Sequence, residues 1–304
     1  MKRFLLAALL LPALAVAAPP SLAERLGYPA GAKLLIIHAD DLGMAHSVNA
    51  ASIAALESGA INSASIIVPC PWLPEIAAWA RANPDADLGL HLTLTAEWSG
   101  FRWRPLLGPG RVPSLYDATG FMYPTEDVAA EHIDPKEAEA EVRAQIERAL
   151  ALGIRPTHLD AHMRTLHMTP ELFAVQLRVA REYGIPAAVS KDLAARPEYA
   201  PLIGPDTIVI NGFEGAGSDL QAKDWPEFYR KVIESLEPGV TQLIVHLAYD
   251  DAEMQGATFD HPGWGAAWRQ RDFDVVSSPE FRKALKDNGV TLVTWRELGK
   301  AARP

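Results

Sequence analysis

The stretch KLLIIHADDLG, residues 33–43, is a run of apolar residues that ends in two adjacent aspartates. A short run that is apolar at nearly every position is typical of a strand buried on both faces of a parallel sheet. Polar residues directly after such a strand lie at its carboxyl end, where parallel α/β folds build their sites. The stretch therefore predicts a strand of an α/β fold with a candidate functional site at its end.

Runs of the same kind recur along the chain, separated by amphipathic segments with helix start signals at Asp134-Pro135, Thr169-Pro170 and Ser278-Pro279. Alternating strands and helices with short connections predict βαβ units. We expect an α/β fold, a distorted TIM-like (β/α) barrel, in preference to an open doubly wound sheet. The expected strands are residues 33–38, 63–68, 88–94, 157–160, 187–190, 207–210, 242–246 and 291–294.

Two long stretches, residues 95–133 and 248–274, show no periodicity and are rich in aromatic side chains. Loops of this length in a compact domain are usually functional or disordered, and aromatic residues argue against disorder. We therefore expect long, aromatic-rich βα loops on the barrel.

The N-terminus resembles a secretory signal peptide. Lys2 and Arg3 precede an apolar run, and small residues end it at Ala15-Val16-Ala17. The run is too short to span a membrane. We expect residues 1–18 to be removed, leaving residues 19–304 as a single (β/α)-barrel catalytic domain that is exported to the periplasm or secreted.

The composition excludes several classes of partner. The chain has 28 Lys and Arg against 38 Asp and Glu, a formal net charge of -10, and no basic cluster after the first few positions. Nucleic acid and anionic membranes are therefore not expected partners. Cys70 is the only cysteine, so no internal disulfide forms. A homodimer is compatible with the sequence, which does not fix the oligomeric state.

Polar residues follow several predicted strands and should meet at one face of the barrel. They are Asp40 and Asp41, then His91, His162 and His246. A catalytic divalent metal needs about three nitrogen or oxygen ligands, and the set Asp41, His91 and His162 supplies them. Adjacent aspartates point in different directions along a strand, so one could bind metal while the other acts as a base. The remaining histidines are expected to be packing, structural or surface residues: His38, His46, His132, His158, His167 and His261.

Four ordered motifs resemble those of the YdjC/ChbG family of carbohydrate deacetylases. They are HADDLG at residues 38–43, GLHLTLT at 89–95, PTHLDAH at 156–162 and LIVH at 243–246. The resemblance implies a divalent-metal-dependent hydrolase that removes N-acetyl groups from amino sugars such as chitooligosaccharides. It implies one metal ion, Mg²⁺ or Zn²⁺, on Asp41, His91 and His162, with Asp40 as general base and His246 as candidate general acid.

A small glycan is the substrate that this resemblance implies. Trp98, Trp103 and Trp264 are candidates to stack on sugar rings, or they pack the long loops onto the barrel. Arg269 and Arg271 could bind substrate or orient Asp40.

Two other functions stay open from the sequence. A metal-independent glycoside hydrolase would use paired carboxylates from Asp40, Asp160, Asp250 or Asp251. A periplasmic sugar-binding protein would use the aromatic residues without turnover.

Overall fold

The structure, a computed structural model, describes residues 20–301. The signal peptide predicted at residues 1–18 therefore lies outside the described residues. Within the described part, none of the helices combines the length and the apolar character that crossing a bilayer requires.

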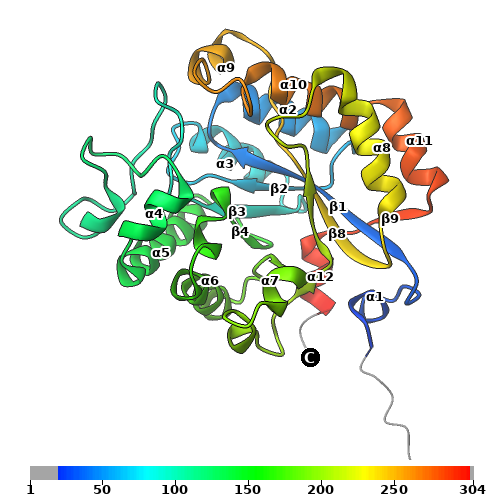
Figure 1. Cartoon of the computed structure of the whole chain (residues 1–304), viewed down its shortest axis with the longest axis horizontal. Coiled ribbons are helices and arrows are strands. Elements are labelled where there is room, and N and C mark those ends of the chain that lie inside the picture. The colour runs from blue at the N-terminus through cyan, green and yellow to red at the C-terminus, as the bar shows by residue number, and fades with distance from the viewer. Residues whose placement is uncertain (1–19, 302–304) are drawn as a thin grey trace, which may run out of the picture.

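A parallel sheet of seven strands forms the centre of the fold (Figure 1). Its strands are β1 (Lys33–Leu42), β2 (Ser63–Ile66), β3 (Leu88–Leu92), β4 (Leu159–Ala161), β7 (Gly212–Gly215), β8 (Gly239–Val245) and β9 (Val290–Leu292). They are hydrogen-bonded in the order β4-β3-β2-β1-β8-β7, and β9 also pairs with β1. Every residue of β1 except the first is buried, as its continuous apolar run predicts.

Two short strands, β5 (Val189–Ser190) and β6 (Val209–Ile210), form a separate parallel pair. A bridge between Leu159 and Ala187 joins the chain just before β5 to β4. The large sheet curls (Figure 1). The small pair also contacts β7 and β8, so it lies between β4 and β7, the two edge strands of the sheet. This arrangement confirms the predicted α/β fold, a distorted TIM-like barrel whose wall is reduced at β5 and β6.

Helices surround the curled sheet (Figure 1). The predicted helix starts are confirmed: Asp134, Thr169 and Ser278 each accept hydrogen bonds from backbone N–H groups of the first turn of the helix that follows. The helices are α1 (Leu22–Arg25), α2 (His46–Glu57), α3 (Leu73–Ala82), α4 (Glu126–His132), α5 (Pro135–Ala151), α6 (Pro170–Tyr183), α7 (Lys191–Ala195), α8 (Trp225–Ser235), α9 (Ala252–Ala257), α10 (Ala266–Val276), α11 (Pro279–Asp287) and α12 (Trp295–Ala301).

The prediction that residues 95–133 and 248–274 lack regular structure is wrong for part of each stretch. The first stretch contains α4, and the second contains α9 and most of α10. Helix α10 buries Arg269 and Asp272, so its buried face does not have the apolar periodicity of an amphipathic helix. Strand β7 was also not predicted, because its sequence GFEG is half glycine and only partly buried.

Candidate active site

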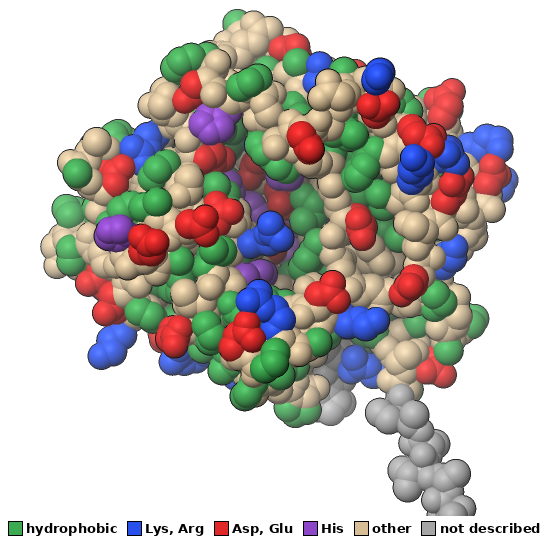
Figure 2. Space-filling model, in the orientation of Figure 1, with side chains coloured by type: hydrophobic (Ala, Val, Ile, Leu, Met, Phe, Trp, Pro, Cys, Tyr) green, Lys and Arg blue, Asp and Glu red, His purple; other side chains and the backbone are tan. Residues whose placement is uncertain are grey.

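The polar residues singled out at the strand ends converge on one face of the barrel. Asp40 and Asp41 lie near the end of β1, and His91 lies in β3. His162 follows β4 directly, and His246 follows β8 directly. Figure 2 shows a hollow in this face with histidine and acidic side chains inside it.

Asp41, His91 and His162 form a compact buried group. The Oδ1 atom of Asp41 lies 3.6 Å from His91 Nε2 and 3.5 Å from His162 Nδ1. One ligand atom from each residue lies within 4.8 Å of the others. Asp41 Oδ1 is buried and has no hydrogen-bond partner among residues 20–301. A buried carboxylate oxygen that faces two ring nitrogens at these distances is suited to a shared cation.

Two carboxylates bind the ring nitrogens of His91 and His162 that face away from Asp41. His91 Nδ1 donates a hydrogen bond to Asp160 Oδ1 (2.8 Å), and His162 Nε2 donates to Glu97 Oε2 (3.0 Å). These bonds leave His91 Nε2 and His162 Nδ1 directed toward Asp41. Metal-binding histidines are held in this way in most metalloenzymes. No sequence signal pointed to Glu97, whereas Asp160 stands two residues before His162.

Arg269 orients the third member of the group. Its Nη2 atom lies 2.8 Å from Asp41 Oδ2, and its Nε donates to the backbone oxygen of Trp264 (2.7 Å). Burial favours the protonated form of Asp41, but the charge of Arg269 and the nearby ring of His162 outweigh it and hold the pKa of Asp41 well below its usual range. Arg269 therefore forms a buried ion pair with an ionised Asp41.

The two adjacent aspartates reach the same point because the backbone departs from strand geometry. Asp41 has a φ of 72°, in the left-handed region, and the β1–β2 register shifts between Ala39 and Leu42. Asp40 Oδ2 and Asp41 Oδ1 consequently both lie 3.6 Å from His91 Nε2. The expectation that the two side chains diverge along a regular strand is therefore wrong. Aspartate tolerates this conformation better than most residues.

Asp40 lies between three histidines. Its Oδ1 is 3.1 Å from His38 Nε2, and its Oδ2 is 3.6 Å from His91 Nε2 and 3.8 Å from His246 Nε2. The side chain is 8% exposed. It can therefore accept a proton close to the Asp41 group.

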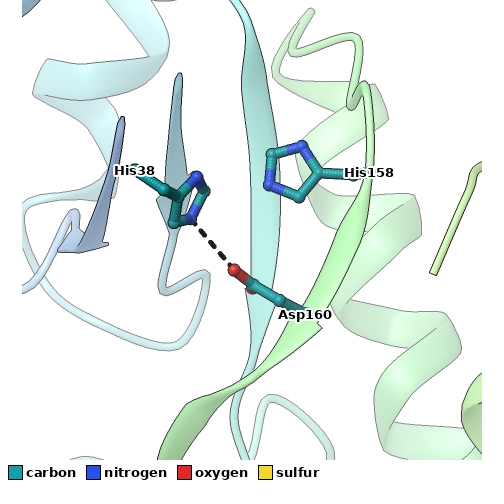
Figure 3. A group of neighbouring side chains, drawn as sticks. All are labelled: His38, His158 and Asp160. Carbon is teal, nitrogen blue, oxygen red and sulfur yellow. Dashed lines mark ion pairs between the residues drawn. The ribbon is translucent and has the colours of Figure 1, made fainter. Parts of the chain in front are cut away.

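His38, predicted to be structural or on the surface, links two carboxylates of the site. Its Nε2 lies 3.0 Å from Asp160 Oδ2 (Figure 3). The same atom lies 3.1 Å from Asp40 Oδ1. Its Nδ1 is hydrogen-bonded to Ser63 Oγ at 2.9 Å. Burial opposes the charged ring, but the bonds to Asp160 and Asp40 outweigh burial and raise the pKa of His38 to about 10. A buried imidazolium here fixes Asp40 and, through Asp160, His91.

His158 packs behind this network. Its ring lies edge-on to His38, with centroids 4.9 Å apart, and stacks on Trp295 at 5.2 Å. Burial and the charge of His38 lower the pKa of His158 to about 4, so the ring is neutral at pH 7. Figure 3 shows His158 beside His38 and Asp160.

We expect Gly89→Ala to destabilise the protein by about 1–3 kcal/mol, because overpacking a tight core has this cost. A methyl group at Gly89 would lie 2.4 Å from His158 Nε2, and that ring is confined by His38 and Trp295. Urea unfolding would measure the loss. Gly108→Ala is the matched control, since its added methyl group meets no atom within 4 Å. Equal unfolding midpoints for the two variants would contradict the assigned packing.

A hydrogen bond fixes the backbone of His246, and its imidazole ring is neutral at pH 7. Its N–H donates to Asp272 Oδ2 (2.9 Å), and its ring contacts Trp264 and Trp268 with centroids 5.2 Å and 5.5 Å away. Burial lowers its pKa to about 4, although Asp41 and Asp40 oppose this shift.

The predicted substrate-binding residues occupy different environments. Trp98 is fully buried and Trp103 is 4% exposed. Trp103 donates its Nε1 hydrogen to the backbone oxygen of Thr95 (2.8 Å). These contacts favour the packing alternative for both rings. The guanidinium of Arg271 lies over the ring of Trp225, 5.5 Å from its centroid.

Comparisons of the sequence and of the structure with known proteins both find relatives that match most of the chain. A model of the family described as YdjC-like protein matches residues 34–287. A carbohydrate deacetylase from Thermus thermophilus is 31% identical, over 92% of this chain and 98% of the relative. A chitooligosaccharide deacetylase from Serratia marcescens is 27% identical, over 88% and 99%. A crystal structure from Enterococcus faecalis V583, described as a candidate cellobiose-phosphate cleavage protein, has a TM-score of 0.73 and 25% identity, over 88% and 99%.

Proposed function

Because the chain belongs to the YdjC-like protein family, we propose that it is a metal-dependent hydrolase that removes N-acetyl groups from amino sugars or chitooligosaccharide-like glycans. The relatives named deacetylases support the reaction. The observation that carries the proposal is the buried Asp41 oxygen that faces His91 and His162, with Asp40 and His246 beside it.

Asp41, His91 and His162 would hold one divalent metal ion. The side chains fit this role, because Asp41 Oδ1 has no hydrogen-bond partner within residues 20–301 and the opposite atoms of Asp41, His91 and His162 are anchored by Arg269, Asp160 and Glu97, respectively. When bound, such an ion polarises the acetamide carbonyl and lowers the pKa of water. Two imidazole nitrogens favour Zn²⁺ over Mg²⁺, which prefers oxygen ligands alone.

Asp40 would act as the general base. Its carboxylate lies within 4 Å of both His91 and His246, and His38 holds the opposite oxygen. A base must be ionised and positioned near the attacking water. The fixed orientation of Asp40 supports the second requirement.

His246 would deliver a proton to the departing amine. Because its pKa is lowered to about 4, the ring is neutral before the reaction and must first receive a proton. Its Nε2 lies 3.8 Å from Asp40 Oδ2, so we propose that the proton taken up by Asp40 passes to His246 and then to the amine. Asp272 fixes the backbone of His246 for this transfer.

The glycoside hydrolase alternative is less well supported by the geometry. Asp40 and Asp160 both contact the same nitrogen of His38, and Asp160 also bonds to His91. Asp251 caps α9, and Asp250 accepts a hydrogen bond from Gln255. None of these pairs is a freely available acid and base. For the sugar-binding alternative, the burial of Trp98 and Trp103 removes two of the expected stacking surfaces.

The expected site of action is outside the cytoplasm. We propose that the chain is exported to the periplasm or the medium, because residues 1–18 have the charge and apolar pattern of a signal peptide. An envelope or extracellular glycan would then be the substrate.

The decisive experiment measures acetate release from N-acetylglucosamine oligomers. We expect release that chelator abolishes and that added Zn²⁺ or Mg²⁺ restores. The two add-back arms identify the metal. Reducing sugar released without acetate, and insensitive to chelator, would instead support a glycoside hydrolase. Tight oligomer binding with neither product would support a binding protein.

A further inference from the structure

The loop that follows His162 contains two consecutive residues in the left-handed backbone region. Met163 has φ 50° and ψ 19°, and Arg164 has φ 56° and ψ 22°. This conformation costs free energy for every residue with a side chain, and glycine is the residue that avoids the cost. Buried Thr165 and Leu166 follow and hold the turn in place. Strain that a structure maintains beside a reactive centre indicates a functional constraint.

The Arg164 side chain is exposed and lacks a protein acceptor. Within residues 20–301 its guanidinium makes no ion pair or hydrogen bond. Some other exposed cations of the chain, such as Arg230 and Lys283, are paired with carboxylates of their own helices, whereas others among the described residues, such as Lys286, are not, so the position beside His162 distinguishes Arg164. A chain with a net charge of -10 offers many such partners. An unpaired Arg two residues after a candidate metal ligand is therefore available for a ligand.

A second unpaired cation stands on the neighbouring loop. Lys191 begins α7 directly after β5, is exposed, and makes no ion pair within the described part of the chain. The parallel bridge between Leu159 and Ala187 aligns β4 with the segment that leads into β5, so the loops after them leave the barrel side by side. Figure 2 shows Lys and Arg side chains along the lower edge of the hollow that contains the histidines.

We propose that Arg164 and Lys191 bind a carboxylate of the glycan substrate, on the acetylated sugar or on its neighbour. This inference rests on the proposed deacetylase function and names the substrate class. Arginine pairs with carboxylates through two parallel hydrogen bonds. A monoanion suits this rim better than a phosphate dianion, because Asp40, Asp41, Glu97 and Asp160 inside the site repel a dianion more strongly.

Three disaccharides test the proposal: N,N′-diacetylchitobiose, N-acetylglucosamine linked to a carboxylate sugar (glucuronic or N-acetylmuramic acid), and diacetylchitobiose 6-phosphate. We expect the wild-type kcat/KM to be about 10- to 100-fold higher for the carboxylate substrate than for the neutral one, as for a charge-assisted hydrogen bond. Equal values would overturn the inference but leave the proposed function intact. A higher value for the phosphate than for the carboxylate would overturn the assignment to a carboxylate.

The variants Arg164→Gly and Lys191→Gln should each move the carboxylate-to-neutral ratio toward one. Glycine suits the backbone at Arg164, so loss of folding is not expected there, and the unfolding midpoint verifies this. Lys286→Gln, an exposed lysine on α11, is the matched control and should keep the wild-type ratio. A wild-type ratio in the double variant would overturn the inference.

Failure of the proposed function is distinguishable from failure of this inference. Release of no acetate from any disaccharide would refute the proposed deacetylase function. Calorimetric binding of the carboxylate disaccharide would then test the carboxylate site on its own. We expect binding that the double variant weakens about 10-fold or more. Equal affinity in wild type and double variant would overturn the carboxylate site.

Discussion

Asp40→Asn is expected to slow acetate release by about 10² to 10⁴-fold, the usual contribution of a general base. The amide keeps the size of the carboxylate but cannot take a proton from water. It retains a contact with His38, which lies 3.1 Å from the Asp40 carboxylate. Divalent metal should remain bound at about wild-type stoichiometry, because Asp41, His91 and His162 are unchanged. Steady-state acetate release and metal content measured by mass spectrometry check both parts.

The matched control for this variant is Asp250→Asn. Asp250 is an exposed carboxylate that accepts a hydrogen bond from Gln255 on α9, and it is one of the four carboxylates from which the glycoside hydrolase alternative would draw its pair. We expect this variant to retain acetate release. Turnover of Asp40→Asn within about twofold of wild type would remove the base role from Asp40. Loss of metal from Asp40→Asn would show instead that Asp40 is itself a ligand.

The barrel could be predicted because its strands are buried on both faces. The run at residues 33–38 is apolar at nearly every position, and β1 is buried accordingly. The segments that escaped prediction lack such a run. Strand β7 is held by pairing with β8 along Gly212–Gly215, which no local pattern encodes. Helix α10 carries Arg269 and Asp272 on its buried face, where amphipathic periodicity requires apolar residues.

The members of the candidate site that follow strands could also be predicted, since parallel strands end at a common face. Residues that support them from elsewhere could not. Glu97 lies in a long loop and reaches His162 only through the folded chain. His38 lies within β1, where a histidine is normally a packing residue, and its role arises from its contact with Asp40, next to the shift in the β1–β2 register. Sequence position indicated where the site lies, and tertiary contacts decided which residues complete it.

His91→Ala and His162→Ala are each expected to abolish tight metal binding and, with it, acetate release. Each change removes one of the three atoms that face one another around Asp41 Oδ1. Two remaining ligands do not make the three-ligand set of a catalytic site. Glu97→Gln should have a smaller effect, a 10- to 100-fold loss of metal affinity, because it keeps His162 but weakens the bond that orients the ring. Competition with a chromogenic chelator would measure all three affinities.

His132→Ala is the matched control for the two ligand variants, since His132 is an exposed histidine on α4 stacked against Tyr123. It should keep full metal occupancy. If His91→Ala and His162→Ala also kept full occupancy, the ligand set would be wrong, and the group of His38, His158 and Asp160 would have to hold the ion. The proposed centre predicts a specific order of metal affinities. His132→Ala keeps wild-type affinity, Glu97→Gln binds metal more weakly, and His91→Ala and His162→Ala lose tight binding. A general loss of folding would lower all four affinities together with the unfolding midpoint, and the midpoint therefore separates the two causes.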